Sequence, residues 1–66
     1  MQVFLNGQTK EVPEHCSLQE LVESLDLKAD RLAIELNHEI VRRQDWSDMR
    51  LRTGDQLEIV HFVGGG

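Results

Sequence analysis

The sequence has very little cysteine, which limits the covalent and metal chemistry open to the chain. Cys16 is the one cysteine among 66 residues. A lone thiol forms no intramolecular disulfide, four-thiolate zinc site or iron–sulfur cluster. Chains without disulfides suit a reducing compartment, so we expect a cytoplasmic location. The histidines His15, His38 and His61 are far apart in the sequence and show no metal-ligand spacing, so we expect no metal site.

Long apolar runs and an excess of positive charge are also absent. No run approaches the roughly 18 apolar residues of a membrane span, and Met1 to Asn6 lacks the basic and apolar blocks of a signal peptide. Seven Lys and Arg against twelve Asp and Glu give a net charge of −5, the wrong sign for binding phosphate backbones. We expect no membrane or nucleic-acid partner. An acidic chain favours basic surfaces on other proteins.

The chain is too short to enclose a large ligand pocket. A domain of 66 residues buries only about 60% of the surface that its unfolded chain exposes. A small-molecule site commonly needs about 300–1,000 Å³. Enclosing such a volume would leave too few buried apolar side chains to form the core of so small a domain. The length therefore favours a carrier or binding protein over an enzyme, and we expect no catalytic residue.

The first part of the chain predicts a β-hairpin. Gln2 to Asn6 alternates in polarity, with Val3 and Leu5 on one face and Phe4 on the other. Asn6-Gly7 is a preferred pair for tight hairpin turns. The second strand is predicted from Gln8 to Val12.

A helix is predicted next, from its capping residues and apolar spacing. Ser17 and Glu20 have the spacing of a capping box, and Cys16 before them can pack against Leu21 as a hydrophobic staple. We expect the helix to end near Asp26 to Lys28. The residues that recur on one helical face are Leu18, Leu21, Val22 and Leu25.

Alternating patterns predict three later strands, at Leu32 to Asn37, Glu39 to Arg42 and Gln56 to Val63. Tight turns are predicted at Asn37-His38 and at Thr53-Gly54-Asp55, and a short helical crossing from Asp45 to Met49 lets Trp46 cover the core. The order strand, strand, helix, strand, strand, strand predicts an α+β fold. We expect a mixed sheet of four or five strands with one helix packed across it, formed by residues 1–63.

The sheet predicted in this way leaves one face without a helix. Phe4, Val60 and Phe62 should share that face, by the alternation along their strands. Adjoining large apolar side chains are uncommon on the surface of a small monomer. We therefore expect these three residues to form a partner surface.

Residues 64–66 are predicted to form a flexible tail. Gly64, Gly65 and Gly66 follow directly on a hydrophobic strand. One interpretation is a frayed terminus, because ordering glycine costs much backbone entropy. The other is that a tail without β-carbons threads a narrow channel in a partner protein and presents the Gly66 carboxylate there; three extended residues reach about 10 Å.

The Gly66 carboxylate must be activated before it can react. It is ionised at neutral pH and is a poor electrophile. A mixed anhydride with a nucleotide phosphate would supply a leaving group, and a thiol or persulfide could then leave sulfur on the glycine as a thiocarboxylate. Gly7 and Gly54 are isolated, and the sequence has no phosphate-binding loop. The activating enzyme must therefore be another protein.

Five segments of the sequence together carry a family resemblance: Val3-Phe4-Leu5-Asn6, Ala33 to Asn37, Ile40-Val41 with Arg43 and Trp46, Gly54-Asp55, and Val63-Gly64-Gly65-Gly66. Through them the chain resembles, over almost its whole length, the ThiS family of ubiquitin-like sulfur carrier proteins. Arg42 departs from that pattern, since relatives commonly have proline before the arginine.

The resemblance implies a β-grasp fold and a cycle of sulfur transfer. A ThiF-type adenylating enzyme would activate Gly66 with ATP and magnesium, a cysteine desulfurase or another persulfide donor would supply sulfur, and the thiazole synthase ThiG would consume it. This chain itself would bind no cofactor. Three alternatives remain open: a small subunit of molybdopterin synthase, a ubiquitin-like protein modifier, and an interaction module with an inert tail.

Overall fold

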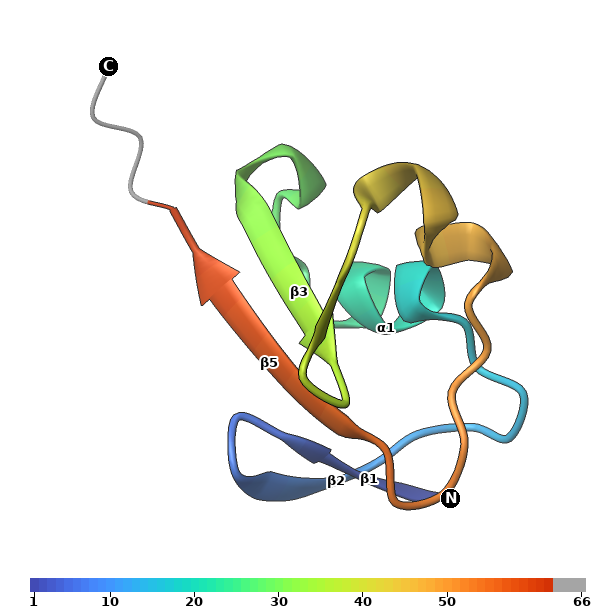
Figure 1. The fold of residues 1–66 in the computed structure, drawn as a ribbon. Helices are drawn as coiled ribbons and strands as arrows, with labels where there is room; N and C mark the ends of the chain where they lie inside the picture. Colours follow the sequence, from blue (N-terminus) through green and yellow to red (C-terminus); the bar gives the residue numbers. More distant parts are fainter. Residues whose placement is uncertain (63–66) are drawn as a thin grey trace.

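Residues 1–62, which the computed structural model describes, form a five-stranded sheet crossed by an α-helix (Figure 1). The helix is α1 (Leu18–Ser24), and two short 3-10 helices are η1 (Ala29–Arg31) and η2 (Arg43–Asp48). This arrangement confirms the predicted α+β fold with a mixed sheet. The strands are β1 (Gln2–Leu5), β2 (Gln8–Glu11), β3 (Leu32–Leu36), β4 (Glu39–Val41) and β5 (Gln56–His61).

The last strand, β5, lies in the middle of the sheet. The strand order is β2-β1-β5-β3-β4. β5 runs parallel to β1, with Phe4 opposite Gln56, and antiparallel to β3, from Leu32 opposite His61 to Leu36 opposite Leu57. The β1–β2 and β3–β4 hairpins therefore join one sheet only through β5.

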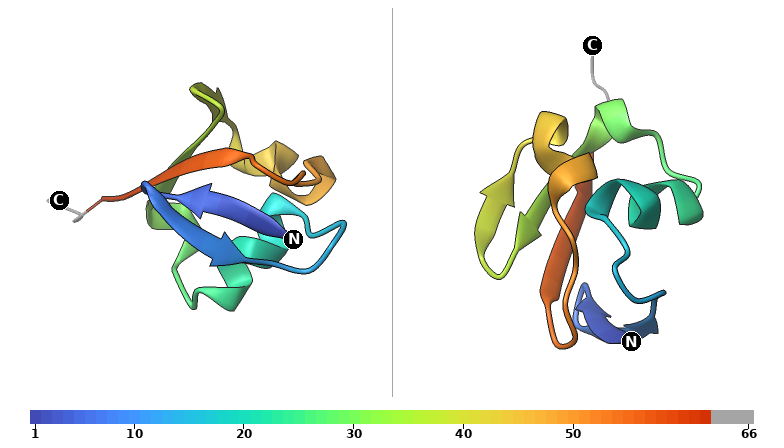
Figure 2. Two further views of the ribbon diagram at one scale, coloured as in Figure 1. Left: turned by 90° about the horizontal axis from the view of Figure 1, so that it is seen from below. Right: turned by 90° about the vertical axis from the view of Figure 1, so that its right-hand side faces the viewer.

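The core lies between the sheet and α1, which covers one face, as the two views of Figure 2 show. The indole of Trp46 is buried, as predicted, and its Nε1–H donates to the Val41 carbonyl over 2.9 Å. Within residues 1–62, no helix combines the length and the apolar character needed to cross a membrane. The largest side chains that are almost fully buried are Trp46, Leu18, Leu21, Ile34, Leu57, Val3 and Val22.

The predicted capping box is present at the start of α1. The Ser17 hydroxyl accepts a hydrogen bond from the Glu20 N–H, and the Glu20 carboxylate accepts one from the Ser17 N–H, both over 3.0 Å. Arg50 adds a 3.2 Å ion pair to the same carboxylate. These contacts satisfy orphan donors of the first helical turn and connect it to the segment before β5.

The helix is shorter than predicted. It ends at Ser24, before the expected Asp26 to Lys28, because Asp26 adopts a left-handed conformation with a φ of 57° that no α-helix continues through. The chain then forms η1 before β3. The sequence pattern did not predict this 3-10 helix.

The end predicted for the last strand was also too late. β5 ends at His61 because its partner β3 begins at the opposite residue, Leu32. The Phe62 N–H continues the contact by donating to the Arg31 carbonyl over 2.7 Å, but Arg31 belongs to η1. Val63 and the predicted tail lie outside the described residues.

The other four strands end one residue earlier than predicted, with β1 ending at Leu5 and β3 at Leu36, each just before the asparagine of its turn. β2 ends at Glu11, although the Val12 N–H still donates to the Met1 carbonyl over 2.8 Å. β4 ends at Val41 because Arg42 caps η2. Arg42 has a φ of −69°, the value that a proline ring imposes, so its backbone has the conformation that the resemblance implies.

Asparagine side chains from two hairpin turns bind β5. Asn6 accepts a hydrogen bond from the Ile59 N–H over 2.8 Å, and its amide donates to the Ile59 carbonyl over 3.3 Å. Asn37 accepts from the Gln56 N–H over 3.0 Å. Both residues have positive φ, 49° and 51°, which asparagine tolerates better than most residues. The predicted turns thus also fix the position of the central strand.

We expect Asn6→Ala and Asn37→Ala each to lower the free energy of unfolding by about 1–3 kcal/mol. Each change removes side-chain hydrogen bonds to β5 and places alanine in the left-handed region. Urea unfolding measures the loss. His38→Gly is the control, because His38 has a φ of 72° and glycine there should add about 0.5–1 kcal/mol. Unchanged stability of both alanine variants would contradict the role assigned to the asparagines.

The capping box should also make stability depend on pH. Hydrogen bonding from Ser17, together with the charge of Arg50, lowers the pKa of Glu20 from its ordinary 4.5. The native state therefore favours the ionised carboxylate, and this stabilisation is present above pH 4.5 and lost as the pH falls through the lower native pKa. Glu20→Gln should be less stable than the wild type at pH 7, and the difference should shrink towards pH 3.

Urea midpoints at several pH values measure this difference. Glu23→Gln is the matched control on the same helix, since the Glu23 carboxylate accepts only a long 3.4 Å hydrogen bond from Gln19 among the contacts of the described residues. A Glu20→Gln effect of equal size at every pH would show that ionisation is not its source.

Candidate functional site

The sheet face opposite α1 carries the apolar residues predicted to bind a partner. Because side chains alternate along a strand, Phe4 and Val60 lie on this open face, whereas Val3 and Leu57 face the core. Figure 2 shows α1 on the other side of the sheet. Phe4, Val60 and Phe62 are 37%, 56% and 53% exposed. The structure therefore agrees with the predicted exposure of all three residues.

The sequence pattern missed a fourth residue of this apolar set. Ile40 is 74% exposed, and it stands opposite Glu35 on the outward side of β4. The signal was present, because Ile40 alternates with the buried Val41. It became informative only once the pairing of β4 with β3 showed which face each residue occupies.

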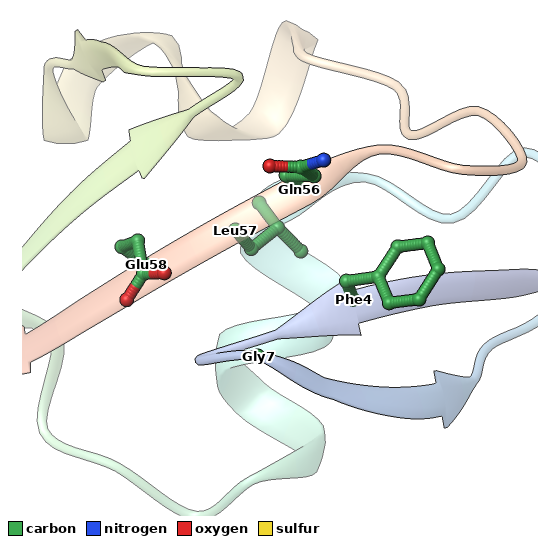
Figure 3. Close-up of a pocket in the computed structure, with 5 residues that line it drawn as sticks. All are labelled: Phe4, Gly7, Gln56, Leu57 and Glu58. Atoms are coloured by element: carbon green, nitrogen blue, oxygen red, sulfur yellow. The ribbon is translucent and has the colours of Figure 1, made fainter.

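A shallow hollow of about 210 Å³ lies beside Phe4 on this side of the molecule. Figure 3 shows Gln56 and Glu58 along β5, Phe4 on the neighbouring β1, and Gly7 at the hairpin turn. The volume is below the roughly 300–1,000 Å³ of common small-molecule sites. Its shape and lining suit contact with a protein surface better than enclosure of a substrate.

The strand that leads to the glycines is the central strand of the sheet. β5 pairs with β1 at Gln56 and Leu57 and with β3 from Leu57 to His61, and it ends on the side of the sheet far from the N-terminus (Figure 1). Gly64, Gly65 and Gly66 themselves lie outside the described residues. The fold therefore provides a fixed base for the segment that carries the predicted reactive carboxylate.

Cys16 has the surroundings of a packing residue. Its side chain is buried in the core cluster that includes Leu21, in agreement with the staple predicted there, and its thiol donates to the Ser17 carbonyl over 3.3 Å. Burial, with the nearby charge of Glu20, raises the pKa of the Cys16 thiol. A protonated, buried thiol is a poor nucleophile.

The described residues offer no metal centre. Across residues 1–62, no three side chains of His, Cys, Asp or Glu are grouped so that they could hold a metal ion. His38 occupies the β3–β4 turn and His61 ends β5, so the fold does not bring the histidines together.

Comparison with known proteins identifies the family. Residues 3–66 match the family described as the ThiS family. The chain belongs to the ThiS family. This is the family of the sulfur carrier proteins of thiamine biosynthesis. The family membership inferred from the sequence is thus confirmed. The match includes Gly64, Gly65 and Gly66 and extends beyond the part of the chain that the structure describes.

Relatives of two kinds share this similarity. Sulfur carrier protein ThiS of Escherichia coli is 30% identical over 66 residues, which is the full length of both chains. A thiazole synthase of Magnetococcus marinus is 33% identical over the same length, and the chain spans only 20% of that protein. A sequence like this one therefore occurs both as a separate protein and as part of a larger one.

A solved ThiS structure has the same fold. The crystal structure of thiamine biosynthesis protein ThiS from Geobacter metallireducens superposes with a TM-score of 0.86 at 30% identity, covering 100% of both chains. The predicted β-grasp fold, a mixed sheet with one helix packed across it, is thereby confirmed.

A substitution by threonine should affect stability differently on the two faces of β5. Val60→Thr on the open face should change the free energy of unfolding by no more than about 0.5 kcal/mol, because the Val60 side chain is exposed. Ile59→Thr is the matched control, since Ile59 packs against the core; it should cost about 1–3 kcal/mol. Urea unfolding compares them, and equal losses would contradict the assignment of faces.

Proposed function

We propose that the chain is a sulfur carrier whose Gly66 carboxylate becomes a thiocarboxylate and donates sulfur to formation of the thiazole ring of thiamine. The observation that carries the proposal is the match of residues 3–66 to the ThiS family, because that match includes Gly66. Similarity to the E. coli sulfur carrier over the full length of both chains supports it.

The chemistry begins with activation of an unreactive group. The Gly66 carboxylate attacks the α-phosphorus of ATP, pyrophosphate leaves, and a mixed anhydride with AMP forms. Magnesium neutralises phosphate charge in the activating enzyme. The anhydride makes AMP the leaving group, which the ionised carboxylate lacks.

Sulfur then replaces oxygen at the acyl carbon. A persulfide on the donor protein attacks the carbonyl carbon and displaces AMP, which gives an acyl disulfide. A second thiol attacks the sulfur that belongs to the donor, so the S–S bond breaks, a new disulfide forms, and the thiocarboxylate remains on Gly66. Sulfur from cysteine reaches the donor through a desulfurase.

Partner enzymes supply every catalytic group in this scheme. The sequence has no phosphate-binding loop, so ATP and magnesium belong to a ThiF-type adenylating enzyme. The thiazole synthase ThiG consumes the sulfur; the occurrence of a similar sequence within a thiazole synthase of M. marinus supports this partner. Gly64 and Gly65 thread the partner sites, and Phe4, Val60 and Phe62 contact the partner surfaces.

The mass of the C-terminal peptide tests the proposal. Incubation with the adenylating enzyme, ATP, magnesium, the desulfurase and cysteine should increase the mass by the replacement of one oxygen by sulfur at Gly66. Omission of ATP should abolish the increase, because the carboxylate is then not activated. Deletion of Gly66 is the second control.

The same assay separates the alternative functions. An unchanged mass in the complete mixture contradicts the proposal. Isopeptide conjugates to lysines identify a protein modifier. A thiocarboxylated chain that restores growth of a molybdenum-cofactor mutant but not of a thiamine auxotroph identifies the other class of sulfur carrier.

A further inference from the structure

The outer edge of β2 has backbone groups that pair with no strand of the described sheet. β2 is the last strand at one edge, beyond β1 (Figure 1). The Met1 amine donates to the Val12 carbonyl over 2.7 Å, and the Val12 N–H donates to the Met1 carbonyl over 2.8 Å. Such hydrogen-bonded pairs alternate along an antiparallel ladder. Thr9 and Glu11 occupy the positions in between, so their N–H and C=O groups point away from β1.

Two shallow hollows lie on the helix side of this edge. The first, of about 390 Å³, has Val12 and Leu21 among its lining residues, and the second, of about 250 Å³, has Leu5 and Leu25. Lys10 lines both hollows and therefore stands between them. We refer to the free edge of β2 and these two hollows together as the β2 groove.

Lys10 is the cation of the β2 groove, and it has no ion pair among residues 1–62. Its side chain is on the helix side, because it stands opposite the buried Val3. The two carboxylates of the groove have cations already: Glu11 pairs with the N-terminal amine over 3.5 Å, and Glu20 pairs with Arg50 over 3.2 Å. The groove thus presents one positive charge between two apolar hollows.

These features together specify an extended peptide as the ligand. Free N–H and C=O groups on a strand edge are a template for one more strand. In an added strand, side chains on one side recur at every second residue, about 6.6–6.8 Å apart. The residue opposite Lys10 therefore faces the ammonium group, and the residues two positions before and after it face the two hollows. Charge complementarity favours an acidic residue in the middle, and the hollows favour apolar residues on either side of it.

We infer that the β2 groove binds an extended segment of another protein as an additional antiparallel strand. The segment has an acidic residue opposite Lys10 and an apolar residue two positions to each side of it. Thr9 and Glu11 each exchange two backbone hydrogen bonds with the segment. This site goes beyond the proposed function and does not depend on it, because it uses neither the apolar residues of the open face nor the glycines.

A second copy of the chain fits the β2 groove less well than such a segment. Antiparallel pairing of two β2 strands that satisfies both Thr9 and Glu11 places Lys10 of one copy directly opposite Lys10 of the other. Like charges at directly opposite positions destabilise a sheet. Lys10 therefore disfavours self-association through this edge and favours a ligand of the opposite charge.

Hydrogen exchange of backbone amides tests the added strand. The probe is a peptide with blocked ends and the sequence Thr-Leu-Thr-Asp-Thr-Leu-Thr. In the free chain, the N–H groups of Thr9 and Glu11 should exchange fast and that of Lys10 slowly, because only Lys10 is hydrogen-bonded to β1. At a peptide concentration about ten times its Kd, exchange at Thr9 and Glu11 should slow about tenfold. Unchanged exchange at these two amides overturns the inference.

Two substitutions of Thr9 distinguish strand addition from other modes of binding. Thr9→Pro removes an N–H that points away from β1, a place where an edge strand tolerates proline, so the hairpin should be retained. It should bind the peptide at least about tenfold more weakly, because a backbone donor is lost and the ring obstructs the added strand. Thr9→Val is the matched control; it keeps the N–H and should bind within about threefold of the wild type. Equal affinity of the two variants, both folded by their melting temperatures, overturns the inference.

Reversal of the charge at Lys10 tests the acidic position without relying on the proline variant. Lys10→Glu should bind the aspartate peptide about 3–10-fold more weakly, and should prefer the same peptide with lysine in place of aspartate. The wild type should have the opposite preference. Absence of this reversal overturns the acidic position. Sedimentation that shows a wild-type dimer, dissociated by Thr9→Pro, assigns the edge to a second copy and also overturns the inference.

Discussion

The structure depends on the position of β5 between β1 and β3. This strand is the one connection between two hairpins that otherwise share no strand pairing in the described sheet. Backbone pairing on both sides holds it, and Asn6 and Asn37 add side-chain hydrogen bonds at Ile59 and Gln56. A turn residue usually serves only its own hairpin, but here each asparagine also binds the central strand. The core, the open face and the base of the glycine segment all follow from this placement.

Most of the fold could be predicted because its signals are local. The Asn6-Gly7 turn, the Ser17 capping box and the alternation before Asn37 each lie within a few residues, and each is present in the structure. The errors concern the ends of elements and the short η1, which was not predicted. The left-handed Asp26 ends α1 early, and β5 stops at His61, where its partner strand begins. Such ends depend on contacts with distant segments, which periodicity does not report.

Some residues of the candidate site could likewise be predicted from local patterns, and others could not. Phe4, Val60 and Phe62 could be assigned to one face from alternation alone, and their exposure agrees. Ile40 could not, because its place on this face follows only from the register of β4 with β3. Gly66 is proposed from its chemistry and from the family match, and not from any contact within the described fold. The exposed apolar surface therefore depends on strand pairing, whereas the proposed reactive group follows from the sequence.

The central position of β5 also determines when the sheet can form during synthesis. The β1–β2 and β3–β4 hairpins leave the ribosome first, but no sheet connects them until Gln56 to His61 emerges. Pairing β1 with β5 closes a loop that spans nearly the whole chain, and such non-local contacts form late. A nascent or truncated chain that lacks β5 would expose two unpaired hairpins to proteases.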